Sequence, residues 1–180
     1  PQMSALILFD FDGTLADTAP DLAAAANQQR TRRGLDPLPY EALRPVASQG
    51  ARGLLRVALG LKAGDPDYEP TRLQFLEDYA ASSTVHSKLF PGIQALLDDI
   101  RQRGLSWGIV TNKAERFTLP LVASIALFAS AGAVVSGDTT PHAKPHPEPL
   151  FEAARRLGLP PQACILSLIH ISEPTRRRGI

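Results

Sequence analysis

The sequence predicts an α/β fold in which a parallel sheet carries an inserted helical domain. Apolar strand-like runs alternate with amphipathic helical runs over residues 4–17 and 89–166. Residues 18–88 contain helical patterns only, and polar side chains follow the ends of successive strands. These three observations divide the chain into an α/β core at 4–17 and 89–166 and a helical insert at 18–88.

Short apolar runs mark the expected strands. They cover residues 6–9, 107–110 and 133–136, and a fourth begins at Cys164. Because helical patterns separate them, the strands are expected to pair in parallel through helical crossovers.

Two amphipathic helices are expected in the core. The first covers residues 91–103 and the second 149–157, and a glycine follows each, as is common after helices. Helical spacing predicts that these helices bury Ile93, Leu96, Leu97 and Ile100, and Leu150, Phe151, Ala154 and Leu157.

The insert is expected to contain helices over residues 21–33, 51–59 and 70–81. In the last of these, Leu73, Leu76 and Tyr79 recur at helical spacing. A helical stretch of this size after the first strand predicts a small domain that lies over the site.

Composition narrows the class of protein. The chain is 44% hydrophobic and 21% charged with a net charge of +1, so we expect a globular protein without a nucleic-acid partner.

A single cysteine, Cys164, precludes an internal disulfide, and the first residues do not resemble a signal peptide, so a cytoplasmic location is expected. Residues 117–137 carry no charge, but Pro120 and many small residues favour a helix and a strand over a membrane span.

Two carboxylates follow the first strand. Asp10 and Asp12 lie two residues apart, so at strand spacing they share one side, and Gly13 permits a sharp turn. At the carboxyl end of a strand, one such carboxylate can attack phosphorus, the other can move a proton, and Mg²⁺ can offset their charge. The alternative is an ordinary turn. A calcium loop is excluded, because its last position would be Asp21 and not glutamate.

Two further clusters follow later strands. Thr111 and Asn112 come after the second strand, where a hydroxyl and backbone N–H groups can hold phosphate oxygens. Lys144 follows the third strand in a proline-rich turn and offers a point charge suited to a phosphoryl group. Each signal is weak alone, but all three fall after successive strands.

These motifs resemble the haloacid dehalogenase superfamily, in the branch with a helical cap after the first motif. Residues 10–14, 111–113 and 144–145 are similar to its first three signature motifs, and the resemblance runs from about residue 6 to 166. Residues 17–22, 49–52 and 136–149 are similar to phosphoglycolate phosphatases, whereas 85–90 resemble N-acetylmuramic acid 6-phosphate phosphatases. The resemblance implies a Rossmann-like core.

The resemblance also implies roles for single residues. Asp10 would be the nucleophile that forms an aspartyl-phosphate, and Asp12 the general acid and base, and both would bind Mg²⁺. Thr111 and Asn112, with the backbone of Gly13, would bind the phosphoryl group. Lys144 would neutralise charge on that group and on the nucleophile.

Other candidates are less specific. Arg52, in the insert, is expected to contact the non-phosphate part of the substrate, although a solvated helix position is an equal alternative. Asp138 is expected to orient Lys144 or to reach the outer shell of the metal, and a role in the turn is an equal alternative. The histidines, among them His142 and His146, show no paired metal-ligand spacing and are expected to be loop residues.

The last residues depart from the family pattern. The family continues its fourth strand into a Gly-Asp element that completes the metal site, whereas this chain reads Ser167-Leu168-Ile169-His170-Ile171-Ser172-Glu173-Pro174-Thr175-Arg176. That decapeptide resembles a translated sequencing adapter, so 167–180 is expected to be an artefactual tail on a C-terminally truncated core; a naturally divergent tail is the alternative. Without the aspartate of that Gly-Asp element, the phosphatase activity of this chain is expected to be weak or absent.

The function expected is therefore a Mg²⁺-dependent phosphomonoesterase acting on a small phosphorylated metabolite, with phosphoglycolate first and N-acetylmuramic acid 6-phosphate second. A sugar-phosphate mutase and a non-catalytic phosphate-binding module are the alternatives on the same fold. Neither nucleic acid nor membrane is an expected partner, and the oligomeric state is not predicted.

Overall fold

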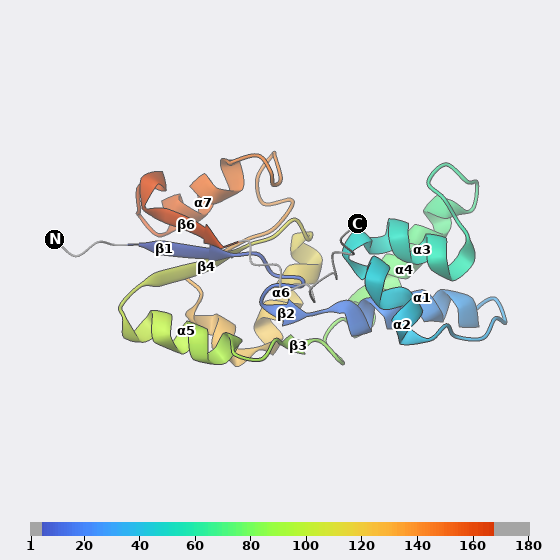
Figure 1. Cartoon of the computed structure of the whole chain (residues 1–180). Coiled ribbons are helices and arrows are strands. Elements are labelled where there is room, and N and C mark those ends of the chain that lie inside the picture. Colours follow the sequence, from blue (N-terminus) through green and yellow to red (C-terminus); the bar gives the residue numbers. More distant parts are fainter. Residues whose placement is uncertain (1–4, 168–180) are drawn as a thin grey trace, which may run out of the picture. The chain divides into compact units, whose positions relative to one another are not determined.

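The structure, a computed structural model, describes the backbone of residues 5–167 and the side chains up to Ala163 (Figure 1). Of the expected artefactual tail at 167–180, only the backbone of Ser167 is described, as the last residue of a strand. Residues 168–180 and the side chain of Cys164 lie outside this part. The described chain divides into two compact units, which are treated separately below. The first contains residues up to 16, 89–114 and from 130 onward, and the second contains 17–88 and 115–129.

A parallel sheet forms the centre of the first unit. Its strands are β1 (Leu6–Phe9), β4 (Ser106–Val110), β5 (Ala133–Val135) and β6 (Cys164–Ser167), in the order β5-β4-β1-β6. Every pairing is parallel, with Leu6 opposite both Ser106 and Cys164. The α/β class with a parallel sheet is thus confirmed.

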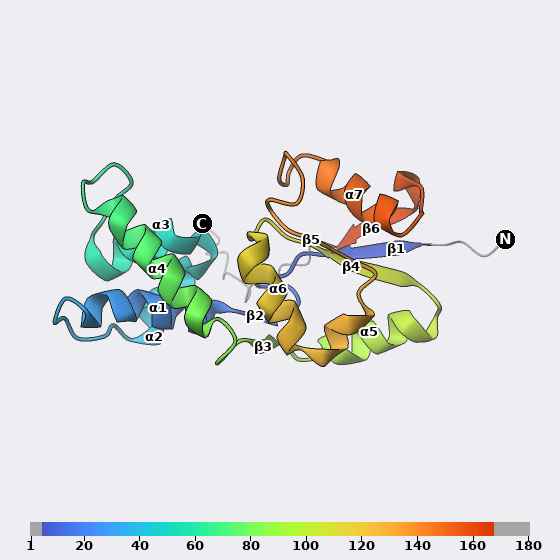
Figure 2. The same ribbon diagram turned by 180° about the vertical axis from the view of Figure 1, so that it is seen from behind.

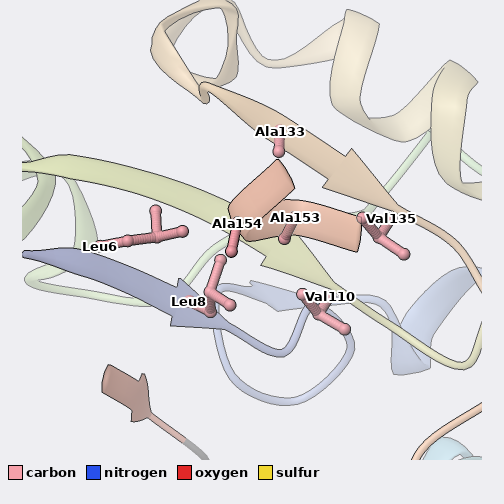
Figure 3. Close-up of a cluster of buried hydrophobic side chains, with 7 residues drawn as sticks. All are labelled: Leu6, Leu8, Val110, Ala133, Val135, Ala153 and Ala154. Carbon is pink, nitrogen blue, oxygen red and sulfur yellow. The ribbon is translucent and has the colours of Figure 1, made fainter. Parts of the chain in front are cut away.

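Two helices cover opposite faces of this sheet. Helix α5 (Ile93–Gln102) lies on one side and α7 (Glu148–Arg156) on the other, as the front view and the view from behind both show (Figures 1 and 2). Beneath α7, a buried cluster joins alternate residues of three strands to two alanines of the helix (Figure 3): Leu6, Leu8, Val110, Ala133, Val135, Ala153 and Ala154. The small side chains of Ala153 and Ala154 let α7 pack closely against the sheet.

The opposite sheet face carries aromatic residues. Phe9 and Trp107 pack edge to face with ring centroids 6.2 Å apart. Helix α5 buries Ile93, Leu97 and Ile100. Two predicted core positions are wrong, because Leu96 is 40% exposed and Phe151 is 50% exposed. Helix α7 buries Pro149, Ala153 and Ala154 instead, so apolar character at helical spacing did not by itself identify the buried face.

Helices dominate the second unit. They are α1 (Ala19–Thr31), α2 (Tyr40–Leu43), α3 (Gly50–Leu59), α4 (Tyr68–Ser82) and α6 (Glu115–Ser124), with a 3₁₀ turn η1 (Arg44–Gln49). Phe75 and Tyr79 of α4 stack, and Phe117 of α6 lies 5.5 Å from the Tyr79 ring. Leu73, expected on the buried face of α4, is 55% exposed, because the helix buries Thr71, Phe75 and Asp78 instead.

The remaining elements are short. Strands β2 (Ala16–Asp17) and β3 (Lys88–Leu89) form a two-stranded sheet, and 3₁₀ turns occupy η2 (Ala126–Ser130) and η3 (Pro161–Ala163). Residues 117–137 form part of α6, η2 and β5. In the part of the chain that the structure describes, no helix has the length and apolar character needed to span a membrane.

Candidate active site

The site is built at one edge of the parallel sheet. Asp10, Thr111 and Ser136 directly follow β1, β4 and β5. Since these strands are parallel and adjacent, their carboxyl ends meet at the same edge, where open α/β sheets bind ligands.

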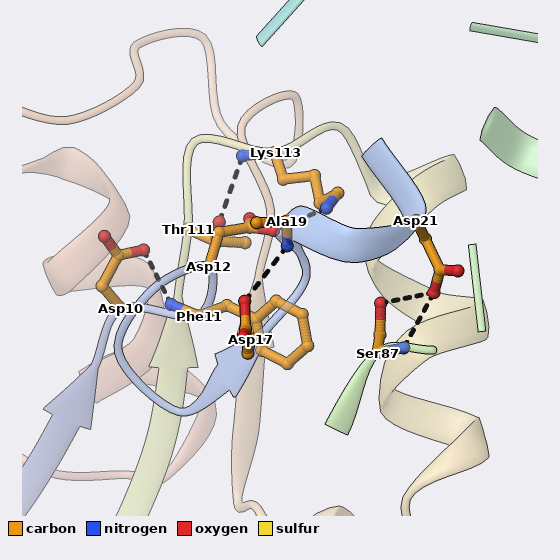
Figure 4. A network of polar contacts seen from close by, with 9 residues as sticks. All are labelled: Asp10, Phe11, Asp12, Asp17, Ala19, Asp21, Ser87, Thr111 and Lys113. Atoms are coloured by element: carbon orange, nitrogen blue, oxygen red, sulfur yellow. Dashed lines mark hydrogen bonds and ion pairs between the residues drawn. The ribbon is translucent and has the colours of Figure 1, made fainter. Parts of the chain in front are cut away.

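A tight turn after β1 orients the two carboxylates. The Phe11 carbonyl accepts backbone hydrogen bonds from Thr14, Leu15 and Ala16 at 3.1, 3.0 and 3.3 Å. Gly13 closes the turn with φ of +73°, a conformation that favours glycine. The turn projects Asp10 and Asp12 from one short loop, so the predicted proximity of the two acids has a backbone cause (Figure 4).

A lysine ammonium faces each carboxylate. Lys144 Nζ lies 3.2 Å from Asp10 Oδ1, and Lys113 Nζ lies 2.6 Å from Asp12 Oδ1. The Phe11 N–H also donates to Asp10 Oδ1 at 2.7 Å. The lysine side chains are only 14% and 10% exposed, whereas those of Asp10 and Asp12 keep 18% and 34% exposure. The two carboxylates are therefore balanced in charge and remain open to solvent.

Sequence reasoning did not assign a role to Lys113. It directly follows Thr111 and Asn112 in the second motif, and its carboxylate partner lies 101 positions away in the chain. The sequence did indicate that a second cation was needed, because two carboxylates at one sheet edge favour more than one nearby positive charge. The fold was required to show that Lys113 provides that charge.

The position of Lys144 is fixed through its backbone. The side-chain amide of Asn112 donates to the Lys144 carbonyl at 3.0 Å, and its Oδ1 accepts from the Lys144 N–H at 2.9 Å. This reciprocal pair uses both polar ends of the Asn112 side chain, as an aspartate or a leucine could not. Asn112 thus connects the loop after β4 to the loop that carries the lysine.

The loops after β4 and β5 also approach each other closely. Gly137 donates to the Lys113 carbonyl at 2.8 Å, and a Cβ at Gly137 would lie 2.1 Å from the Asn112 carbonyl oxygen. The Thr111 N–H donates to the Val135 carbonyl at 2.9 Å, and its side-chain oxygen accepts from the Lys113 N–H at 3.1 Å. The buried Thr111 hydroxyl is thereby oriented at the sheet edge.

Acidic residues of the second unit have different surroundings. The Asp21 carboxylate, 3% exposed, accepts from the His86 N–H at 2.9 and 3.0 Å. It also accepts from the Ser87 N–H at 2.8 Å and from the Ser87 hydroxyl at 2.7 Å (Figure 4). This network joins the start of α1 to the segment before β3. Asp21 therefore holds two distant parts of the helical unit together.

Asp17 is paired with a cation in the same unit. Arg44 Nη1 lies 3.0 and 3.2 Å from the two Asp17 oxygens and also donates to the Tyr40 hydroxyl. The hydrogen bond to Tyr40, with a smaller contribution from the Asp17 carboxylate, raises the pKa of Arg44. The residues at 17 and 21 that resembled a family motif thus make structural contacts.

The other predicted residues lie on exposed positions. Arg52 lies on α3 of the second unit and is exposed. Asp138 is exposed in the turn after β5, where Thr139 donates to the Ser136 carbonyl at 3.2 Å. His142 and His146 are exposed in the loop around Lys144, as expected of loop residues.

Comparisons with known proteins identify relatives of this chain. Residues 7–166 match the model of a family described as haloacid dehalogenase-like hydrolase. The chain is 41% identical over 155 residues to the N-acetylmuramic acid 6-phosphate phosphatase of Pseudomonas aeruginosa, covering 86% of this chain and 69% of that protein. It is 38% identical over 160 residues to a phosphoglycolate phosphatase of Xanthomonas campestris pv. campestris strain 8004, covering 88% and 72%.

A solved structure has the same fold. The crystal structure of a predicted phosphoglycolate phosphatase from Haemophilus somnus 129PT superposes with a TM-score of 0.73 at 24% identity, covering 92% of this chain and 76% of that one. At this identity the likeness establishes the architecture of the chain.

Proposed function

Because the chain belongs to the haloacid dehalogenase-like hydrolase family, we propose that it is a phosphomonoesterase that forms an aspartyl-phosphate on Asp10. The observation that carries the proposal is the pairing of Asp10 with Lys144 at 3.2 Å and of Asp12 with Lys113 at 2.6 Å. Two carboxylates with separate cations can take two different roles at one sheet edge. The buried acids Asp21 and Asp78 of the second unit lack this exposure.

In the first step, a carboxylate oxygen of Asp10 attacks phosphorus as the bond from phosphorus to the ester oxygen breaks. Asp12, in its protonated form, gives its proton to the departing alcohol oxygen. In the second step, Asp12 takes a proton from water, the water oxygen attacks phosphorus, and the bond to Asp10 breaks. The products are the free alcohol and inorganic phosphate, and both aspartates return to their starting states.

The lysines stabilise the charge that moves during these steps. Phosphoryl transfer depends on positioning and on charge stabilisation more than on elaborate covalent chemistry. Lys144 supplies a fixed positive charge beside the attacking oxygen, and Asn112 holds the backbone of that lysine. Thr111 and the loop N–H groups, including that of Gly13, would bind the phosphoryl oxygens.

A magnesium ion fits the residues present. Mg²⁺ prefers oxygen ligands and is usually held by one or two carboxylates together with substrate phosphate. Asp10 and Asp12 offer such oxygens, and the two lysines already balance their charge. A phosphate dianion brings two further negative charges to this set, and bound Mg²⁺ would help to offset them.

The substrate we propose is a small phosphate ester, with phosphoglycolate as the first candidate and N-acetylmuramic acid 6-phosphate as the second. Relatives with both names match the chain at similar identity. We propose that the helical insert at 18–88 acts as a cap that selects the substrate and that Arg52 contacts its non-phosphate part. The single cysteine supports a reducing, cytoplasmic location.

Steady-state assays of the 180-residue chain test the proposal. Turnover by this chain is expected to be weak, because the sequence after Leu166 lacks the Gly-Asp element that completes the family's metal site. Both candidate substrates and a small generic phosphate ester are compared with Mg²⁺ and after its removal by a chelator. Asp10→Asn is expected to abolish turnover, and Asp12→Asn to lower it by about 10²–10⁴-fold, because general acid and base assistance is lost. The matched control is Asp99→Asn, an exposed acid of α5 paired with Arg103. Near-normal turnover by Asp10→Asn would contradict the aspartyl-phosphate mechanism.

A further inference from the structure

A second set of ligand-type side chains lies in the loop between β5 and α7. His142, His146 and Glu148 each offer one ligand atom, and these atoms all lie within 4.8 Å of one another. The three residues fall within seven positions of the chain, in one unit. None of them takes part in the proposed phosphatase chemistry.

The contacts within this set are direct. The two imidazole rings have centroids 4.5 Å apart, and His146 Nδ1 lies 3.8 Å from Glu148 Oε2. The Glu148 N–H donates to His146 Nδ1 at 3.2 Å in this structure, and an ion bound to that nitrogen would replace this hydrogen bond. The set is therefore a local cluster with two nitrogen ligands and one oxygen ligand.

We propose that His142, His146 and Glu148 form a binding site for a divalent transition-metal ion of the zinc class, separate from the carboxylate pair at Asp10 and Asp12. Two imidazoles and one carboxylate form a ligand set that zinc takes in proteins, with water in the fourth position. Magnesium prefers oxygen ligands, so the two sites differ in the ions that they select.

The geometry is close to what a four-coordinate ion requires. Zinc bonds of about 2.0–2.1 Å place neighbouring ligand atoms about 3.3 Å apart, so the cluster must contract. His142 and His146 are exposed, so rotation of their side chains can close this difference. Prolines at 141, 145 and 147 flank the histidines and restrict the loop backbone, which lowers the entropy lost when an ion orders it.

The site also borders a residue of the proposed mechanism. Lys144 lies between the two histidines, with its backbone bound to Asn112 and its side chain directed to Asp10. A metal that joins His142 to His146 would fix this loop on one side of Lys144, while Asn112 fixes it on the other.

The test is a calorimetric titration of the 180-residue chain with ZnCl₂ in a large excess of Mg²⁺, which occupies an all-oxygen site. One equivalent of zinc is expected to bind, and His142→Asn and His146→Asn are each expected to weaken its affinity at least tenfold. Both positions are exposed, so far-ultraviolet circular dichroism should confirm that the variants fold. His86→Asn, at an exposed histidine of the second unit, is the matched control and should bind as the parent does.

Cobalt(II) gives a second readout. Its ligand-field absorption reports imidazole coordination in a four-coordinate site, and this spectrum should be lost in the double variant of His142 and His146 but kept in His86→Asn. Three results would overturn the proposal: no zinc binding in excess Mg²⁺, unchanged binding by the double variant, or equal loss in the His86 control. The readouts do not depend on phosphatase activity, so the outcome is independent of the proposed function.

Discussion

Two aspartates of the helical unit and two at the sheet edge have contrasting surroundings. In the helical unit, Asp21 and Asp78 are 3% and 7% exposed. Asp21 accepts from two backbone N–H groups and a hydroxyl, and Asp78 accepts from Gln29 at 2.5 Å and forms an ion pair with Arg32 at 2.5 Å. At the sheet edge, Asp10 and Asp12 each face a lysine and keep 18% and 34% exposure.

The difference separates a structural acid from a reactive one. A buried carboxylate that accepts several hydrogen bonds is strongly stabilised in place, and its loss leaves donors without partners. A carboxylate that is balanced by a lysine and still open to solvent can exchange its neighbours for a substrate. Exposure and partners therefore distinguish Asp10 and Asp12 from the buried Asp21 and Asp78. Asp17 is also paired with a cation and is 20% exposed, but it lies in β2 and does not follow a strand of the parallel sheet.

Outside the carboxylate pair itself, the largest effect is expected at Lys144. Lys144→Met removes the positive charge beside Asp10 and should lower kcat by about 10²–10³-fold, as is typical when one group that stabilises transition-state charge is lost. Lys62→Met, at an exposed lysine of the helical unit, is the control and should leave kcat unchanged. If Lys144→Met kept kcat within about threefold, the proposed role of the sheet-edge charge balance would be wrong.

A structural effect is expected at Asp21. Asp21→Ala leaves the N–H groups of His86 and Ser87 without their acceptor, so the free energy of unfolding should fall by about 3 kcal/mol. Urea unfolding followed by circular dichroism measures this change. Asp99→Ala breaks only an exposed ion pair with Arg103 and should cost less than about 1 kcal/mol. Equal losses in the two variants would remove the distinction between buried and exposed acids.

A smaller, selective effect is expected at Arg52. Arg52→Ala should change the ratio of kcat/KM between phosphoglycolate and N-acetylmuramic acid 6-phosphate by about tenfold, while hydrolysis of a generic ester persists. Arg56→Ala, at an exposed position of the same helix, is the control. Equal losses on every substrate would place Arg52 in folding or catalysis and not in selection.

The smallest effect, on thermal stability, is expected at Glu152. This acid is paired with two arginines and has no role in the candidate active site. Hydrogen bonds from Arg155 and Arg156 lower the pKa of Glu152 to about 2. Because the folded-state pKa is depressed, its stabilisation is present above the unfolded-state pKa and fades as the pH falls toward 2. Glu152→Gln should therefore lower Tm slightly at pH 7, and the difference should shrink between about pH 5 and pH 2. A difference in Tm that is constant with pH would contradict this assignment.

Much of the sheet edge was predictable from sequence. Strand spacing put Asp10 and Asp12 on one side of the chain, and the parallel pairing brings Thr111 to the same edge. Lys113 could not be assigned, because its ion pair with Asp12 forms only when β1 and β4 lie side by side. The two hydrogen bonds between the Asn112 side chain and the Lys144 backbone are likewise tertiary contacts.

Helix faces were less predictable. Leu73 and Phe151 are apolar residues at helical spacing, yet both are exposed. Periodicity gives the direction of an apolar stripe but not its width, which depends on the partners that each helix meets. In α4 the buried positions include the polar residues Thr71 and Asp78, whose side chains find hydrogen-bond partners from α1 and the following loop, Gln29, Arg32 and Arg33.

The most direct measurement is to locate the phosphoryl group on the enzyme during turnover. The 180-residue chain is mixed with substrate and Mg²⁺, quenched in acid within a single turnover, digested with pepsin at low pH and mapped by mass spectrometry. The predicted result is a transient phosphoryl group on Asp10, present in Asp99→Asn and absent from Asp10→Asn. Phosphate release without any labelled peptide, or a label on another residue such as Asp12, would contradict the assignment of Asp10 as the nucleophile.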